Sequence, residues 1–139
     1  MPKGKEGIMQ TFLVHPNYRT SAQSLDNRRL FSQIYESIHI LASLVDMNEA
    51  LVNPKRNVAN HPVARLWKGH EASLLAYAYT HYKVWAAKYK PTEETINAKN
   101  LEIIRNAAMI GSGECPILDR IPYYKLLLKT KDPEFYHAL

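Results

Sequence analysis

The sequence is short of the residues on which several structural classes depend. Of its 139 residues only Cys115 is a cysteine, so neither an internal disulfide nor a thiolate metal site can be assembled. Five glycines and eight prolines are too few for a sandwich of many tight turns or for a disordered chain. No apolar run approaches the roughly 20 residues that cross a bilayer, and residues 1–8 lack the apolar stretch of a secretory signal. We therefore expect an intracellular protein that does not contact a membrane.

Positive charge is what the chain has in surplus. The formal net charge is +5, with 18 Lys and Arg against 13 Asp and Glu. A polyanion such as DNA or RNA suits this surplus, because lysine and arginine release counterions when they neutralise phosphates. The alternative is a lysine-rich surface that only keeps the protein soluble.

Hydrophobic residues recur with helical spacing along most of the chain. After a short ordered segment over Gln10–Val14, we expect a first helix from Thr20, where Gln23 completes a capping-box pattern. Its apolar stripe consists of Leu30, Ile34, Ile38, Leu41 and Val45. A second helix is expected from Pro62 to about Lys88, and it is central because it is apolar on more than one face.

The rest of the chain predicts further helices and no strand pair. A third helix is expected from about Ile96 until Gly111 stops it, and a short last helix from Pro122 through about Thr130. The predicted fold class is all-α, a compact single domain of three principal helices plus a short C-terminal helix. Residues 1–8 are expected to form a flexible N-terminal arm, and residues 9–139 the all-helical domain.

One carboxylate lies on the polar face of the first predicted helix. At about 100° per residue, Glu36 lies nearly opposite the apolar stripe, on the same side as Arg29 and Gln33. A carboxylate beside an arginine and an amide can act as a positioned acid or base. A solvated polar face would give the same spacing.

Histidines do not assemble into a metal site by their spacing. The pair His70–Glu71 begins like a zinc-protease helix motif, but Leu74 stands where the second histidine belongs. His70 and His81 could share a helix face, yet no third ligand follows at helical spacing. Core histidines with hydrogen-bond partners explain them better, so no metal is expected.

Basic residues fall in clusters that could follow a phosphate backbone. Arg28–Arg29 and Lys55–Arg56 are adjacent pairs, and Lys125 and Lys129 are one helical turn apart. Nearby aromatic residues could stack on unpaired bases or close the core. These aromatic residues are Tyr123, Tyr124, Phe135 and Tyr136.

Three segments, in this order, carry a resemblance to a known family. They are LDNRRLFSQIYE at 25–36, NHPVARLWKGHE at 60–71 and LLKTKDPEFY at 127–136. Together they resemble the pyrimidine-dimer DNA glycosylases, the phage endonuclease V type and its bacterial relatives, over residues 9–136. The resemblance implies a compact all-α repair enzyme that needs no cofactor and acts as a monomer on damaged double-stranded DNA.

The resemblance also implies a reaction and the residues that carry it. Members of the family cut the glycosidic bond of a damaged pyrimidine through an imine and then nick the backbone by β-elimination, an AP-lyase activity. The acid/base glutamate falls on Glu36, the basic pair on Lys125 and Lys129, and a histidine at the start of the central helix on His61. Expected DNA contacts are Arg28, Arg29, Gln33, His61, Lys125 and Lys129.

This chain departs from the phage pattern at three places. Arginines next to the glutamate and three residues after it are replaced by Tyr35 and His39, so Arg28, Arg29 or Lys55–Arg56 would have to supply the phosphate clamp. The third departure is the extra stretch before Met9. The family's nucleophile is the chain's α-amine, which is partly neutral at physiological pH because its pKa is ~7.7–8.0 against ~10.4 for lysine. That amine would belong to Pro2 if Met1 is removed, or to Met9 or Gln10 if the working start lies there; a lysine is a third possibility.

Two rival interpretations remain open at this point. A non-catalytic DNA-binding module could keep the same scaffold, and the displaced N-terminus favours that interpretation. A helical protein-interaction module would bind DNA with little dependence on salt, whereas several phosphate contacts give a steep one.

Overall fold

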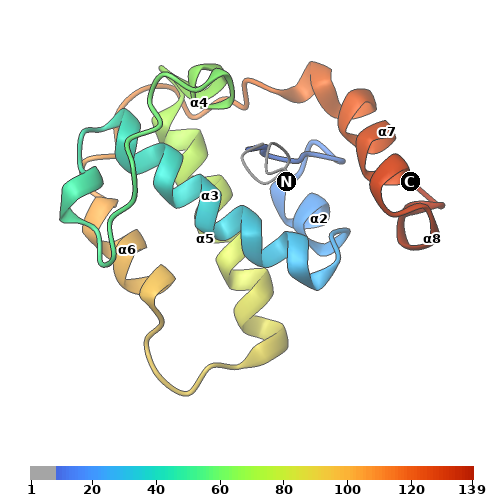
Figure 1. Ribbon diagram of the computed structural model, residues 1–139, viewed down its shortest axis with the longest axis horizontal. Coiled ribbons are helices and arrows are strands. Elements are labelled where there is room, and N and C mark those ends of the chain that lie inside the picture. Colours follow the sequence, from blue (N-terminus) through green and yellow to red (C-terminus); the bar gives the residue numbers. More distant parts are fainter. Residues whose placement is uncertain (1–8) are drawn as a thin grey trace.

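The computed structural model describes residues 9–139, and all the regular secondary structure in that range is helical, as predicted. The α-helices are α2 (Tyr18–Gln23), α3 (Asn27–Leu44), α4 (Pro62–Trp67), α5 (Glu71–Tyr89), α6 (Ile96–Ile104), α7 (Ile121–Lys131) and α8 (Pro133–Tyr136). Two short 3-10 helices span Asn48–Ala50 and Leu118–Arg120. Figure 1 shows α3 and α5 crossing at the centre, with α6 on one side and α7 and α8 on the other. Among residues 9–139 no helix is long and apolar enough to span a membrane.

The first expected helix is two helices, and its predicted start at Thr20 is wrong. Asn17 caps α2 because its side chain accepts a hydrogen bond from the Thr20 backbone N–H. The chain then becomes extended at Asp26, whose carboxylate accepts from the Arg29 backbone N–H and so begins α3. Both residues are strong N-caps, and each starts a helix of its own.

The second expected helix is also divided, at Gly69. This glycine has φ +88°, a conformation that residues with a Cβ rarely adopt, and it separates α4 from α5. Gly111 packs against the same turn, where Ser112 donates its backbone N–H to the Gly69 carbonyl at 2.7 Å. A Cβ at Gly111 would collide with the Glu71 carboxylate and would lie 2.8 Å from the Gly69 carbonyl oxygen. The two glycines therefore fix the start of the central helix.

The last two predicted helices exist with different bounds. Helix α6 ends at Ile104 and is followed by turns, so Gly111 does not terminate it as expected. Helix α7 begins one residue before Pro122 and extends to Lys131, one residue past the predicted end. Asp132 then accepts a hydrogen bond from the Phe135 backbone and caps the short helix α8.

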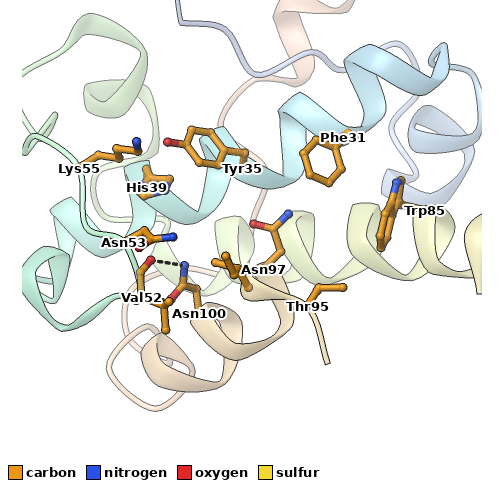
Figure 2. A pocket seen from close by; sticks show the side chains of 11 residues that line it. Phe31, Tyr35, His39, Val52, Asn53, Lys55, Trp85, Thr95, Asn97 and Asn100 are labelled. Carbon is orange, nitrogen blue, oxygen red and sulfur yellow. Dashed lines mark hydrogen bonds between the residues drawn. The ribbon is translucent and has the colours of Figure 1, made fainter. Parts of the chain in front are cut away.

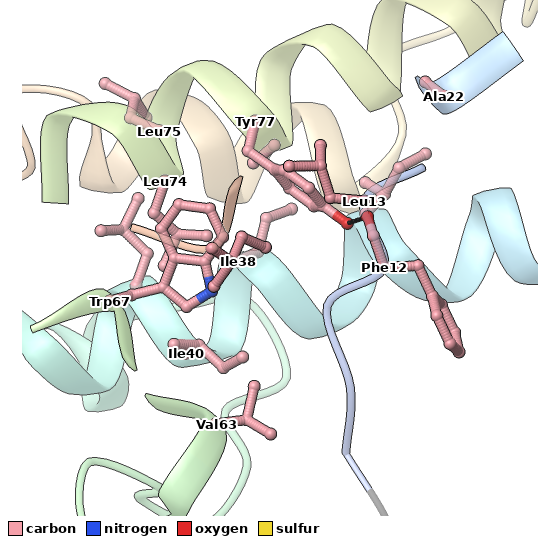
Figure 3. Close-up of a cluster of buried hydrophobic side chains, with 14 of the residues drawn as sticks. Phe12, Leu13, Ala22, Ile38, Ile40, Val63, Trp67, Leu74, Leu75 and Tyr77 are labelled. Carbon is pink, nitrogen blue, oxygen red and sulfur yellow. Dashed lines mark hydrogen bonds between the residues drawn. The ribbon is translucent and has the colours of Figure 1, made fainter. Parts of the chain in front are cut away.

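The core lies between α3, α5 and the chain segment that precedes α2. Ile34, Ile38 and Leu41 of the predicted stripe are fully buried. Figure 3 shows the Trp67 indole between α3 and α5, and the Tyr77 hydroxyl donating to the Phe12 carbonyl, at 2.7 Å. Residues 11–14 are all buried, so this part of the predicted ordered segment belongs to the core.

Candidate active site

Glu36 borders a surface hollow of about 270 Å³ where three parts of the chain meet. The hollow is lined by Gln10, Phe12, Arg28, Arg29, Ser32, Gln33, Glu36 and Lys131. Five of these residues come from α3, two from the segment before α2 and one from the end of α7. The predicted grouping of Glu36 with Arg29 and Gln33 is therefore present, and two cations beside Arg29 join it.

A network of neutral hydrogen bonds fixes the backbone in front of Glu36. Gln33, only 1% exposed, donates from Nε2 to the Gln10 carbonyl at 2.9 Å. Its Oε1 accepts from the Phe12 N–H at 2.9 Å and from the Tyr77 hydroxyl at 2.6 Å. The Gln10 backbone nitrogen then donates to Glu36 Oε1 at 3.2 Å. A backbone nitrogen thus lies within hydrogen-bond reach of the carboxylate.

The surroundings of Glu36 tune its protonation. Burial raises the pKa of the carboxyl group to about 7, and the hydrogen bond from the Gln10 backbone partly opposes this rise. The charged form is disfavoured because it gives up solvation that one N–H cannot replace. A group with a pKa near neutrality can both release and accept a proton at physiological pH, which suits an acid/base catalyst.

The three cations of this hollow differ in their exposure to solvent and in their ion-pair partners. Arg28 is exposed. Arg29 forms ion pairs with Asp26 at 3.0 Å and with Asp132 at 3.7 Å, and its side chain is only 14% exposed. Lys131 comes from the far end of the sequence, and the site prediction missed it because the one-turn spacing singled out Lys125 and Lys129 instead. The available signal was that Lys131 follows Lys129 by two residues in the sequence.

Glu36 also borders a second hollow, of about 310 Å³, on its other side. This hollow is lined by Met9, Tyr35, Glu36, His39, Lys55, Arg56 and Val58. The Tyr35 and His39 rings lie 4.3 Å apart between their centroids, where the phage pattern has arginines. The cations here come instead from the loop pair Lys55–Arg56, one of the sources that the sequence suggested.

A larger hollow, of about 500 Å³, continues along α3 away from Glu36. Figure 2 shows Phe31 and Trp85 on one side of it and the Asn97 amide directed between α3 and α5. The ring centroids of Phe31 and Trp85 are 5.6 Å apart. This hollow shares Tyr35, His39 and Lys55 with the second one but contains no carboxylate. Glu36, with its pKa of about 7, lines only the smaller hollows, and a perturbed pKa in a hollow is typical of an acid/base site, so we take these two hollows as the candidate active site.

A family model described as pyrimidine dimer DNA glycosylase matches residues 9–97. The chain belongs to this family. The match includes Glu36, the segment hydrogen-bonded to it, and every residue of the second hollow. Lys131 and the rest of α7 follow the matched region. No curated protein and no solved structure is significantly similar to the chain.

The other residues that the resemblance to pyrimidine dimer glycosylases singled out are spread over the structure. His61 caps α4, where its Nδ1 accepts from the Val63 N–H at 3.1 Å. Lys125 and Lys129 lie on α7, in the turns that precede Lys131. Pro2 is outside the described residues. Contacts of these residues with DNA stay predictions.

Two residues considered as metal ligands have structural partners in this glycosylase family member. Glu71 accepts from the Gly69 backbone N–H at 3.1 Å, and His70 Nδ1 lies 3.1 Å from the Glu114 carbonyl oxygen. Within residues 9–139 there is no cluster of three or more His, Cys, Asp and Glu side chains arranged to hold a metal ion.

Proposed function

We propose that the protein is a DNA N-glycosylase with an associated AP-lyase activity, acting on pyrimidine dimers or another modified pyrimidine in duplex DNA. The observation that carries this proposal is Glu36: a half-buried carboxyl group with a pKa of about 7, 3.2 Å from a backbone nitrogen, in hollows that are also lined by cations. The family supplies the substrate class, and the position of Glu36 supports the imine route.

The proposed reaction needs an amine and a group that moves protons. The neutral amine bonds to C1′ of the damaged nucleotide while the bond from C1′ to the base breaks, and the electron pair leaves with the base, which takes up a proton. Protonation of the ring oxygen then opens the sugar to an imine. Loss of a proton from C2′ expels the 3′ phosphate and nicks the strand. Glu36 is the proposed donor and acceptor of these protons.

The position of the Gln10 backbone nitrogen helps to identify the amine that could react. Because this atom is hydrogen-bonded to Glu36, a chain processed to begin at Gln10 would carry its α-amine next to the carboxylate. A start at Met9, which lines the second hollow, would place the amine one residue away. Both starts fit the geometry, and Pro2 and the lysine at the first hollow, Lys131, are the remaining candidates.

The proposed DNA-binding face surrounds the two hollows. Arg28, Lys55 and Arg56 are exposed cations close to Glu36, and they are the proposed phosphate contacts there. Lys125 and Lys129 extend the face along α7. Gln33 and His61 contribute to this face indirectly, because their side chains bind backbone groups. Gln33 holds residues 10–12, and His61 caps the start of α4.

Borohydride trapping tests the proposal. The wild-type protein should form a covalent adduct with ultraviolet-irradiated duplex DNA in borohydride, and should nick the same duplex without it. Glu36→Gln should lower the nicking rate by about 100-fold or more while keeping DNA affinity, whereas Glu93→Gln, at an exposed loop position, should change neither. Mass spectrometry of the trapped peptide identifies the amine.

The rival interpretations predict different results. A DNA-binding module on this scaffold would bind irradiated DNA without adduct or nick, and that outcome would reject the lyase mechanism. A protein-interaction module would bind DNA weakly, with little dependence on salt.

A further inference from the structure

The C-terminal end of the chain is fastened to the start of α3 by a group of four side chains. Tyr136, 1% exposed, donates its hydroxyl to Asp26 Oδ1 in a short hydrogen bond and accepts the Asp26 backbone N–H at 2.9 Å. Arg29 bridges the two chain segments through its ion pairs with Asp26, at 3.0 Å, and Asp132, at 3.7 Å. Its guanidinium also lies over the Tyr136 ring, 5.8 Å from the centroid. We call Asp26, Arg29, Asp132 and Tyr136 the clasp.

Within the clasp Arg29 is occupied by protein partners. Its side chain is only 14% exposed and is paired with two carboxylates and an aromatic face, so little of it is open to a DNA phosphate. Burial of the Tyr136 hydroxyl, together with its bond to Asp26, raises the pKa of Tyr136 to about 12, which keeps the hydroxyl a proton donor. The surroundings of Arg29 therefore suit a structural link better than a phosphate contact.

What the clasp holds is the last turn of α7. Lys131 immediately precedes Asp132 in the chain, and it is the α7 residue that lines the Glu36 hollow. Its side chain is exposed, and the described residues 9–139 give it no carboxylate partner within ion-pair distance. Among the described residues Lys131 is thus a cation without an ion-pair partner, at a place that depends on residues 110 positions apart in sequence.

From this arrangement we propose that Lys131 contacts the DNA phosphate next to the lesion, and that Arg29 is a positioning residue that, with Tyr136, keeps Lys131 at the Glu36 hollow. This inference rests on the proposed function, since it takes damaged duplex DNA as the ligand. It replaces the expected phosphate contact of Arg29 by one from Lys131. It also assigns a role in DNA binding to α7 and α8, which lie outside the region that matches the family.

Salt dependence of DNA binding tests the inference with variants of the full chain. The ligand is a duplex with one stable abasic-site analogue, and the binding constant is measured over a range of salt concentrations. Lys131→Met should lower the slope of log K against log salt by about 0.9, the value for one lost phosphate contact. Tyr136→Phe removes no charge, yet it should lower the slope by a similar amount because Lys131 is no longer held in place. The double variant should show no further decrease.

Three controls separate positioning from a general loss of structure. Tyr89→Phe removes an exposed hydroxyl at the end of α5, outside the hollows at Glu36, and should leave the slope unchanged. Arg29→Lys retains the charge but loses the planar guanidinium that lies over the Tyr136 ring, so it should behave like Tyr136→Phe. A direct contact between residue 29 and a phosphate would survive this change. The melting temperature of each variant, measured in parallel, sets a temperature at which all are folded.

Two results would overturn the inference. A wild-type slope in Tyr136→Phe, alongside a lowered slope in Lys131→Met, would show that the clasp does not position the lysine. A wild-type slope in Lys131→Met would remove the contact itself. Failure of the proposed function is distinguishable, because it shows in the wild-type protein as absence of adduct and nick, whatever the slopes of the variants.

Discussion

Two chain segments approach Glu36, and they are attached to α3 in opposite ways. The leading segment, Gln10–Val14, is held by neutral hydrogen bonds through Gln33, which is almost fully buried. The C-terminal arm, α7 with α8, packs Tyr124 and Leu128 into the core, and its end is held by the clasp, in which the Asp26 and Asp132 side chains are 17% and 38% exposed. The attachment of the leading segment is buried and uncharged, whereas the attachment at the end of the arm is ionic and partly open to water.

Because of this difference, the backbone at Glu36 is rigid, whereas the position of Lys131 can adjust. Buried neutral hydrogen bonds are costly to break and insensitive to salt, so the distance between Glu36 and the leading backbone is fixed. Ion pairs near the surface are weak and screened by salt, so the position of Lys131 adjusts more easily. The acid/base geometry is thereby protected, while the contact with the DNA backbone can adapt.

The largest loss of stability should follow from breaking the buried attachment. Gln33→Leu leaves the Phe12 N–H, the Gln10 carbonyl and the Tyr77 hydroxyl without their shared partner. The Tyr77 hydroxyl keeps the Phe12 carbonyl as its acceptor, so two groups are left unsatisfied. Because each costs about 1–3 kcal/mol, we expect the free energy of unfolding to fall by at least about 2 kcal/mol, measured by urea denaturation. Nicking should fall as well at temperatures where the variant is folded, since the backbone facing Glu36 is released.

Gln23→Leu is the matched control for this change. Gln23 is exposed at the end of α2, so its loss should alter unfolding by less than about 0.5 kcal/mol. A Gln33→Leu protein with wild-type stability and nicking would contradict the distinction between the two attachments.

The free energy of unfolding of Glu36→Gln, measured against wild type over a range of pH, tests the carboxyl group that lies between the two attachments. The folded pKa of Glu36, about 7, lies above its usual value of 4.5, so the folded state prefers the protonated acid. Ionisation therefore costs stability as the pH rises from about 4.5 through 7, and the cost is complete above 7. We expect the Gln variant to be more stable than wild type by about 3 kcal/mol at pH 8, and the gain to vanish below about pH 4. An equal gain at both pH values would exclude a perturbed Glu36.

The smallest effect should come from the charge of the clasp. Asp26→Asn keeps an N-cap for α3, because asparagine caps as well as aspartate, but it weakens the ion pair with Arg29. We expect a loss of about 1 kcal/mol or less in the free energy of unfolding, which shrinks in high salt. A Gln33→Leu loss, by contrast, should be the same in low and high salt.

The pH dependence of this clasp effect has its own sign. Burial acts to raise the pKa of Asp26, but hydrogen bonds from Tyr136 and Arg29 outweigh it and leave the pKa below its usual value of 3.8. The stabilising charge is therefore present above pH 3.8 and is lost only as the pH falls through the lowered pKa. The difference between wild type and Asp26→Asn should stay constant from pH 5 to 8, and a difference that changed within this range would contradict the assignment.

Sequence predicted the parts of this site that depend on local spacing. The stripe through Ile34 and Ile38 gave the buried face of α3, and thus the placement of Glu36 away from it. The breaks at Asp26 and Gly69 were missed because apolar spacing continues across both, while a cap and a positive φ interrupt the backbone. Lys131 could not be placed, since its position depends on contacts between Tyr136 and Asp26, far apart in the chain. Such pairing is a property of tertiary packing and leaves no periodic signal.

The attachment of α7 and α8 through a small set of side chains, the clasp together with the buried Tyr124 and Leu128 of α7, has a consequence for how such enzymes diversify. An arm attached in this way is a replaceable part: residues 118–139 could be exchanged for another basic helix that retains equivalents of these residues. The preference for one kind of DNA damage over another could then shift by grafting, while the proton transfer proposed for Glu36 is inherited unchanged.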